Sequence, residues 1–191
     1  MILYSSIILI CMAIISTLNI LFVPFGYTAW QVIGLVCFSV FAEIIIDLIL
    51  AGIIHSMPEK WFSPDKKFFC VSKRERKFYE KLGIKKWKDK VLELGAIGGF
   101  RKNKLKDSND PDYLKLFLVE SNKGIVIHIS NIILGFLVIF CIPLKNWLVI
   151  SIPVAIVNTF LGLLPIFILR YNIPKLKVAL LRIEKKATHN E

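Results

Sequence analysis

The stretch from Phe78 to Lys90 reads Phe-Tyr-Glu-Lys-Leu-Gly-Ile-Lys-Lys-Trp-Lys-Asp-Lys and lies in the middle of the only long polar segment of the chain. Two long apolar runs precede this segment and two follow it. A run of about 20 apolar residues is long enough to cross the ~30 Å hydrocarbon core of a bilayer. The pattern therefore predicts an all-α, polytopic membrane protein. Its four transmembrane helices form two helical hairpins, and they hold a basic cytoplasmic loop that contains short interfacial helices.

The composition also indicates a membrane protein. Of the 191 residues, 55% are hydrophobic, whereas a soluble domain usually has ~45–50% apolar residues. The excess is gathered in blocks, as membrane spans require. We therefore expect a single membrane domain over 1–191. Its expected parts are a first transmembrane hairpin (1–54), a basic loop (55–124), a second transmembrane hairpin (125–169) and an amphipathic tail (170–191).

The positive charges orient this domain. The net charge is +11, and of the 25 Lys and Arg residues 18 lie between His55 and Gly124, six lie from Arg170 to the end, and Lys145 is the remaining one. Short loops rich in Lys and Arg stay on the cytoplasmic side of a membrane. We expect the loop and both termini to be cytoplasmic and both outer turns to be short.

The first apolar run, Met1 to Val23, has two interpretations. A cleaved signal peptide needs a basic start and small residues at a cleavage site. The start of this chain carries no positive charge, which favours a retained span. Pro24 and Gly26 then form the predicted outer turn.

The second span, Tyr27 to Ile54, contains two carboxylates. Glu43 and Asp47 lie four residues apart and therefore share one helical face. A carboxylate in hydrocarbon is costly and usually marks a bundle interior, a polar cavity or a proton path. The alternative is that both side chains reach water or loop lysines from the cytoplasmic half of the span. The sequence leaves these two interpretations open.

The loop is predicted to contain two short helices. Ser72 and Glu75 have the spacing of a capping box, so a helix is expected from Ser72 to Leu82, and Gly83 is expected to stop it. A second short helix follows and is expected to end near Gly95.

Most of the loop's positive charge, including the cluster Arg101–Lys104, is explained by orientation and by attraction to anionic lipid, at ~1 kcal/mol per residue near the surface. Paired aromatics beside lysines, Trp61-Phe62 and Phe68-Phe69, are typical of an interfacial anchor. Neither attraction to lipid nor interfacial anchoring requires Trp87 to lie between Lys86 and Lys88.

The third apolar run begins amphipathic and carries Glu120 and His128 on its cytoplasmic part. Eight residues at about 100° each bring these side chains within ~80° of one another, roughly two turns apart.

The fourth run, Leu148 to Leu169, contains Pro165, which is expected to leave a carbonyl one turn back without its helical hydrogen bond. Pro174 is expected to end this helix, because the residue before a proline disfavours helical geometry. An amphipathic helix on the membrane surface is expected to follow, with a solvated tail as the alternative.

Several kinds of site are not indicated. The four cysteines show no Cys-x-x-Cys pair and no metal-ligand spacing. The chain also has no glycine-rich nucleotide loop, serine elbow or His-x-x-x-x-Asp acyltransferase box. We expect no metal, no cofactor and no nucleic-acid partner.

From the loop onward the chain resembles the glycosyl-4,4'-diaponeurosporenoate acyltransferases, a family of small bacterial membrane proteins. The matching residues are Phe78-Tyr79, Lys85-Lys86-Trp87-Lys88-Asp89, Glu120 with His128, and Pro165 with Arg170-Tyr171-Asn172-x-Pro174. The resemblance implies transfer of a fatty acyl chain to the glucose of a glycosylated carotenoid acid, the last step to staphyloxanthin-type pigments, at the bacterial cell membrane. The chain departs from the family at Ile129, Gly162 and Leu169, where Trp, Asn and Gln are often found. These departures leave the acceptor open.

Acyl transfer to a sugar hydroxyl needs a base for the hydroxyl proton and donors for the developing oxyanion. His128 is the predicted base, because neutral imidazole is available near pH 7. Glu120 is predicted to orient His128 or to hold the sugar hydroxyls. The predicted substrate-binding donors at the same membrane depth are Arg170, Tyr171 and Asn172.

The loop supplies the predicted donor site. Lys86 and Lys88 are expected to bind the phosphates of an acyl-CoA or an acidic acyl carrier protein, while Trp87 packs on the acyl stem. A non-catalytic alternative stays open: a membrane subunit, a lipid-binding adaptor or a small carrier whose polar feature is Glu43 with Asp47. Loss of function in His128→Ala would favour the catalyst, and dependence on the two carboxylates would favour the carrier.

Overall fold

The computed structural model describes residues 2–23, 26–91 and 110–187, and every structural statement below refers to these ranges. Within them the chain forms helices and turns and no strand. Four helical segments are long and apolar enough to cross a membrane: Tyr4–Phe22, Ala29–Ser56, Pro111–Cys141 and Leu144–Lys185. The predicted all-α class with four spans is confirmed. Pro24, Gly95 and the cluster Arg101–Lys104 lie outside the described residues.

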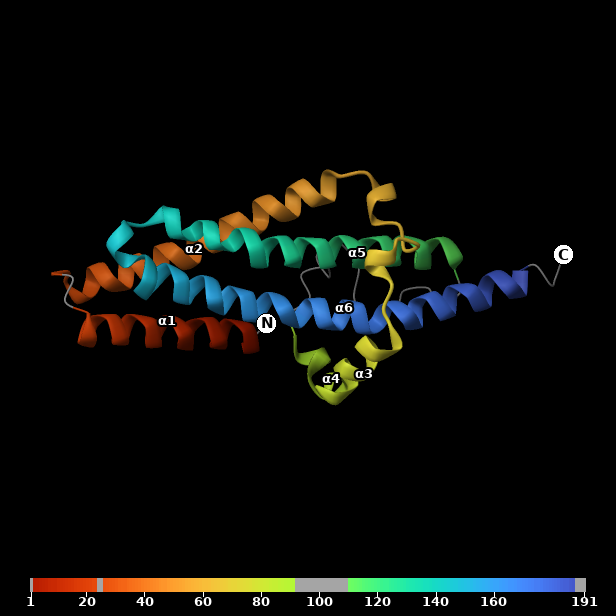
Figure 1. The fold of residues 1–191 in the computed structure, drawn as a ribbon, viewed down its shortest axis with the longest axis horizontal. Coiled ribbons are helices and arrows are strands. Elements are labelled where there is room, and N and C mark those ends of the chain that lie inside the picture. The colour runs from red at the N-terminus through yellow and green to blue at the C-terminus, as the bar shows by residue number, and fades with distance from the viewer. Residues whose placement is uncertain (1, 24–25, 92–109, 188–191) are drawn as a thin grey trace. The chain divides into compact units, whose positions relative to one another are not determined.

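The α-helices are α1 (Ile2–Phe22), α2 (Ala29–Ser56), α3 (Lys73–Lys81), α4 (Ile84–Trp87), α5 (Pro111–Leu134) and α6 (Ile152–Ala187) (Figure 1). Short 3-10 segments join them: η1 (Glu59–Phe62), η2 (Lys67–Phe69), η3 (Lys88–Lys90), η5 (Gly135–Cys141) and η6 (Leu144–Asn146). A π-helical turn, η7 (Trp147–Ser151), precedes α6.

The chain divides into two compact units. Unit 1 comprises Met1–Ile53 and Ile127–Leu163, and unit 2 comprises Ile54–Val126 and Leu164–Glu191. Helices α2, α5 and α6 contribute residues to both units.

In unit 1, α1 lies beside the N-terminal part of α6 (Figure 1). A buried apolar cluster made of Ile15, Val36, Ile142, Ile150 and Val154 forms the core. Polar contacts hold both ends of α1. Asn19 Nδ2 donates to the Val149 carbonyl at 2.8 Å, and the Tyr4 hydroxyl donates to the Leu161 carbonyl at 3.0 Å.

The contact of Tyr4 has a specific cause in the sequence. Pro165 has no backbone N–H, so the carbonyl four residues earlier, that of Leu161, loses its helical partner. The Tyr4 hydroxyl takes that place. The predicted freed carbonyl is thus satisfied by a side chain from the first span, as happens where a proline is tolerated in a membrane helix.

In unit 2, the loop begins with η1 and η2 and continues into α3. The Ser72 side chain accepts a hydrogen bond from the Glu75 backbone N–H at 3.1 Å, so the predicted cap is confirmed. Gly83 has φ of 65°, a left-handed conformation that glycine adopts without steric cost, and it ends α3 as predicted. The second loop helix is short, because α4 passes into η3 at Lys88.

The prediction that Pro174 ends the fourth helix is wrong, because α6 continues from Ile152 to Ala187 through both Pro165 and Pro174. A proline inside a helix costs ~3 kcal/mol or more. Beyond the span, α6 buries Ile173 and Leu176, which are 1% and 7% exposed. Burial of such a side chain contributes ~1.5–3 kcal/mol. Packing of the continued helix therefore offsets the loss at Pro174.

Candidate functional site

The loop is packed on α6 within unit 2. The ring of Tyr79, which is 4% exposed, lies 5.4 Å from that of Phe167, and the ring of Phe78 lies 6.1 Å from it. These aromatic contacts seat α3 against the middle of α6 (Figure 1). The Phe78-Tyr79 pair of the sequence thus positions the loop.

Arg170 reinforces this packing. Its guanidinium donates to both carboxylate oxygens of Glu75, through Nε to Oε1 and through Nη2 to Oε2 at 3.0 Å. Nη1 donates to the Phe68 carbonyl at 2.9 Å, and Nη2 also approaches the Cys70 carbonyl at 3.3 Å. The donor groups of Arg170 therefore bind the loop of this same chain.

Glu75 is the centre of that network. Its Oε1 also accepts the Tyr79 hydroxyl at 2.6 Å. Burial by itself raises the pKa of Glu75, but hydrogen bonds from Arg170 and Tyr79 outweigh burial and hold this pKa below its ordinary value. Burial, and then the hydrogen bond to Glu75, raise the pKa of Tyr79 well above its ordinary value. The carboxylate stays charged and the phenol stays protonated at neutral pH.

The predicted donor-binding residues lie on α4 and η3. Lys86 is exposed and, with Glu80, Gly83 and Lys85, lines a hollow of about 270 Å³. Trp87 is half-buried and its indole N–H donates to the Leu82 carbonyl at 3.0 Å, which fixes the ring against the preceding turn. Lys88 Nζ is 3.9 Å from an Asp89 carboxylate oxygen.

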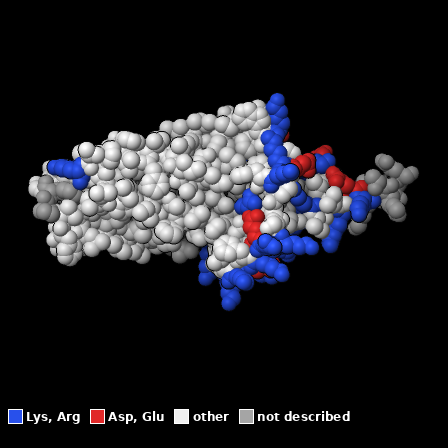
Figure 2. Space-filling view, viewed as in Figure 1, with Lys and Arg blue, Asp and Glu red and all other residues white. Residues whose placement is uncertain are grey.

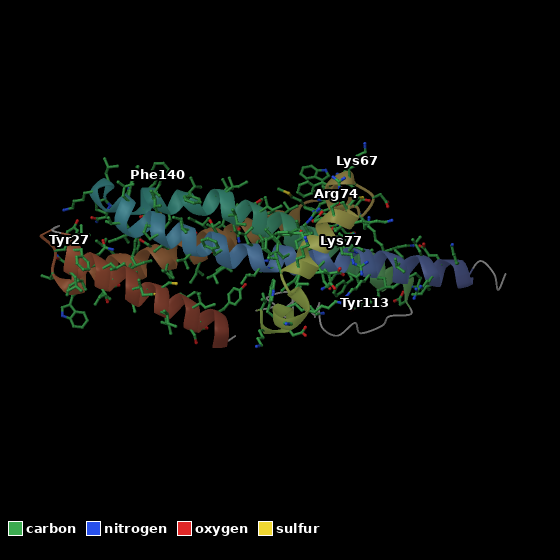
Figure 3. The ribbon with its side chains drawn as sticks, turned by 60° about the horizontal axis from the view of Figure 1, so that its bottom comes forward. Tyr27, Lys67, Arg74, Lys77, Tyr113 and Phe140 are labelled. Atoms are coloured by element: carbon green, nitrogen blue, oxygen red, sulfur yellow. The ribbon has the colours of Figure 1, made fainter. Side chains whose placement is uncertain are left out.

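Positive side chains surround this region. Lys and Arg gather over the loop elements and the C-terminal part of α6 in Figure 2, and the surface over α1 is almost free of charge in the same view. Lys67 on η2 and the pair Arg74 and Lys77 on α3 are exposed (Figure 3). Such a surface attracts phosphate groups, whether of lipid or of an acyl donor.

Tyr171 and Asn172 follow Arg170 on α6. Tyr171 is fully buried, and its hydroxyl has no hydrogen-bond partner among the described residues. Lys175 Nζ lies 4.5 Å from the centroid of its ring. Asn172 is half-buried. Of the three predicted donors on α6, Tyr171 is the one whose buried polar atom is left without a partner in the described structure.

Glu120 has partners that the sequence did not indicate. Its Oε1 accepts from Lys123 Nζ at 2.8 Å, and its Oε2 lies 3.6 Å from His55 Nε2 at the end of α2. Lys123 is only 6% exposed, so this ion pair is largely removed from water. His128 is half-buried and lies eight residues further along α5, a rise of ~12 Å. Residues of one helix that face each other are three or four apart.

The comparison with protein families decides the identity. Residues 58–182 match the family model described as glycosyl-4,4'-diaponeurosporenoate acyltransferase. The chain belongs to this family. Comparison with curated proteins gives no match, and comparison with solved structures gives none either. Membership of the glycosyl-4,4'-diaponeurosporenoate acyltransferase family supports an acyltransferase of carotenoid biosynthesis that uses an acyl donor and a glycolipid acceptor.

Unit 1 holds a second polar cluster, which begins before the part of the chain that matches the acyltransferase family. Glu43 is 4% exposed, and its Oε2 accepts from Asn158 Nδ2 at 3.0 Å. The interpretation of Glu43 as a residue of the bundle interior is therefore confirmed. A Cβ added to Gly135 would lie 2.9 Å from the same oxygen, so a larger residue there would require the carboxylate to shift. The described residues contain no group of three His, Cys, Asp or Glu that could hold a metal ion.

Proposed function

We propose that this chain transfers a fatty acyl group from an acyl-CoA or an acyl carrier protein to a hydroxyl of a lipid-linked sugar. The acceptor is a glycosyl-carotenoid or a similar glycolipid, and the reaction takes place at the cytoplasmic face of a bacterial cell membrane. The observation that supports the proposal is the family match over residues 58–182, which includes every predicted site residue: Lys86, Trp87, Lys88, Glu120, His128, Arg170, Tyr171 and Asn172.

His128 is the proposed general base. It takes the proton of the attacking hydroxyl as the hydroxyl oxygen forms its bond to the thioester carbonyl carbon. When the carbon–sulfur bond breaks, the imidazolium returns this proton to the leaving thiolate. Glu120 is then proposed to hold acceptor hydroxyls, because its separation from His128 along α5 and its contacts with Lys123 and His55 favour this role over orienting His128.

The tetrahedral intermediate needs hydrogen-bond donors at its oxyanion. The buried hydroxyl of Tyr171 supports a role for this residue as a donor, since it has no partner among the described residues. Asn172 is the second proposed donor. Arg170 is proposed to act as a positioning residue, because its donors hold Glu75 and the carbonyls of Phe68 and Cys70.

Lys86 and Lys88 are proposed to bind the phosphates of the acyl donor. The hollow that Lys86 lines carries one carboxylate, Glu80, and two lysines, so an anionic group is favoured there. Trp87, fixed by its hydrogen bond to Leu82, would then present its ring to the acyl stem.

The experiment compares two histidines in purified, lipid-reconstituted protein supplied with an acyl-CoA and a glucosylated lipid. His128→Ala and His128→Gln are expected to lower the acylation rate ~10²–10⁴-fold, the usual cost of removing a general base. His189→Ala changes the histidine near the end of the sequence and is the control. It is expected to leave the activity unchanged. Near-normal acylation by His128→Ala would show that the base lies elsewhere.

A non-catalytic membrane subunit, lipid-binding adaptor or small carrier remains the alternative, and the buried pairing of Glu43 with Asn158 is the observation that favours it. Lipid analysis of cells with and without the protein separates the two functions. A catalyst predicts that one acylated glycolipid disappears when the protein is absent. A carrier predicts the same set of lipids in an altered distribution.

A further inference from the structure

The carboxylates of unit 1 lack a basic partner in the sequence of that unit. Glu43 and Asp47 are its two acidic residues, and Lys145 is its one Lys or Arg. Lys145 lies elsewhere, with Nζ 4.2 Å from the centroid of the Tyr27 ring. Charged groups inside a membrane bundle normally pair with one another or line a path for a polar ligand. The charge of this cluster is therefore not explained by an ion pair within unit 1.

Helix geometry places a fourth polar residue at the same level. Gly135, at the start of η5, approaches the carboxylate of Glu43, and in unit 1 α2 and α5 run in opposite directions (Figure 1). One turn further along α2 is Asp47, and one turn back along α5 is Asn131. Asp47 and Asn131 are therefore level with each other. Asn131 is 7% exposed.

The polar atoms without partners in this cluster are two carboxyl oxygens and one amide oxygen. Glu43 Oε1, Asp47 Oδ1 and Asn131 Oδ1 are buried and have no hydrogen-bond partner among the described residues. The Asn158 amide nitrogen donates to Glu43 Oε2. A buried polar atom without a partner costs ~1–3 kcal/mol. The cluster is therefore complementary to a ligand that brings several hydrogen-bond donors.

We infer that Glu43, Asp47 and Asn131 bind the hydroxyl groups of the sugar on the acceptor lipid, in place of Glu120, which lies on the opposite side of His128 along α5. This inference rests on the proposed function, in which His128 removes a proton from one of those hydroxyls. His128 lies three residues before Asn131 on α5, and residues three apart share a helix face. Vicinal sugar hydroxyls donate readily to carboxylate and amide oxygens, and a hydrogen bond to an ionised carboxylate is strong. The site gives the acceptor its orientation, and Gly135 lets the Glu43 carboxylate keep its position beside Asn158.

The test measures binding without any acyl donor, so its result does not depend on catalysis. Purified protein in phosphatidylglycerol nanodiscs is titrated with dodecyl β-D-glucoside and, as the matched probe, with dodecyl tetrahydropyranyl ether, which has the same chain and ring without hydroxyls. The glucoside is expected to bind saturably and to raise the unfolding temperature, whereas the ether is not. Asn131→Leu and Asp47→Leu are each expected to weaken glucoside binding about tenfold, the effect of losing one good hydrogen bond.

Two variants keep the result interpretable. Asp47→Asn retains an acceptor oxygen, so it is expected to bind the glucoside more tightly than Asp47→Leu does. Ser39→Ala is the control on the same helix, because the Ser39 hydroxyl is already bound to the Leu35 carbonyl at 2.9 Å. It is expected to bind like the unmutated protein.

Three outcomes overturn the inference. The first is equal binding of the glucoside and the ether, and the second is unchanged glucoside affinity in folded Asn131→Leu. The third is an unfolding temperature that rises when Na⁺ replaces choline in the buffer, with this rise lost in Asp47→Leu. The last outcome would assign the oxygens to a cation. Hydroxyl-dependent binding without acyl transfer would leave the site intact and remove the proposed function. Acyl transfer without hydroxyl-dependent binding would keep the proposed function and remove the sugar site at Glu43, Asp47 and Asn131.

Discussion

Arg170 on α6 holds Glu75 on α3 through both carboxylate oxygens, with Nε donating to Oε1 and Nη2 donating to Oε2 at 3.0 Å. A planar guanidinium fits a carboxylate in this two-bonded arrangement, and lysine cannot reproduce it. The same guanidinium also binds carbonyls of the segment before α3, those of Phe68 and Cys70. The Arg170 side chain therefore fixes the segment from Phe68 to Cys70 and helix α3 against α6.

This relationship predicts the cost of breaking the pair. Arg170→Lys or Glu75→Gln is expected to lower the free energy of unfolding by about 1–3 kcal/mol, because hydrogen bonds to charged, partly buried groups are lost. Arg76→Lys is the control, since its pair with Glu80 is much more exposed and worth about 0.5 kcal/mol. Thermal unfolding in nanodiscs gives both values. Equal effects of Arg170→Lys and Arg76→Lys would contradict the proposed positioning role.

The pair also predicts a pH dependence. The folded-state pKa of Glu75 is lowered, so its contribution to stability is fully present above the unfolded value of about 4.3 and is lost as pH falls through the lower folded value. Limited proteolysis of the loop should therefore accelerate in acid, below about pH 4. Glu75→Gln has no carboxylate to protonate and should show a flatter profile. An identical acid profile in Glu75→Gln would assign the effect to other carboxylates.

The sequence was sufficient for features that depend on local geometry. Ser72 caps α3 because a hydroxyl three residues before Glu75 can accept the Glu75 backbone N–H, and Pro165 frees the carbonyl of Leu161 because proline has no N–H. Both follow from the order of residues along one helix. The four spans follow in the same way from the length of the apolar runs.

The partners of Glu120 were not predictable in this way. Helical periodicity gives the angle between Glu120 and His128 around one helix, but it does not say which side chains a different helix brings near. His55 comes from the end of α2, 65 residues earlier in the chain, and only the packed structure places it beside Glu120. The end of α6 was missed for a similar reason, since tertiary burial of Ile173 and Leu176 outweighs the local preference at Pro174.

Topology is tested by labelling single cysteines from outside sealed cells, after the four natural cysteines have been replaced. Leu144→Cys in the predicted outer turn is expected to react, because this position is 71% exposed. Asn146 in the same turn is fully buried and is therefore not a suitable position for the cysteine. Lys66→Cys in the loop is exposed as well and is expected to stay unlabelled until the cells are opened. Labelling of Lys66→Cys in sealed cells would reverse the orientation.

The contact between Tyr4 and Leu161 predicts an energetic coupling to Pro165. Tyr4→Phe leaves the freed Leu161 carbonyl without its donor and is expected to cost about 1 kcal/mol of stability. In a Pro165→Ala background the alanine N–H can satisfy that carbonyl, so Tyr4→Phe should cost much less. The double-mutant cycle measures the difference. Strictly additive effects would show that the tyrosine does not compensate for the proline.

Variants of the loop lysines test whether the charged surface binds the acyl donor or only anionic lipid. Lys86→Gln with Lys88→Gln is expected to raise the apparent KM for acyl-CoA about tenfold at low ionic strength and to leave kcat nearly unchanged, because cations that bind phosphate equally in ground and transition states affect binding alone. The difference from the unmutated protein should shrink as salt rises, since exposed charges are screened. Lys67→Gln removes an exposed lysine of the same loop, outside the hollow that Lys86 lines, and controls for general attraction to anionic lipid (Figure 3). If the double variant and Lys67→Gln change KM equally, the lysines are lipid anchors. If only the double variant does, the surface around Trp87 binds the donor.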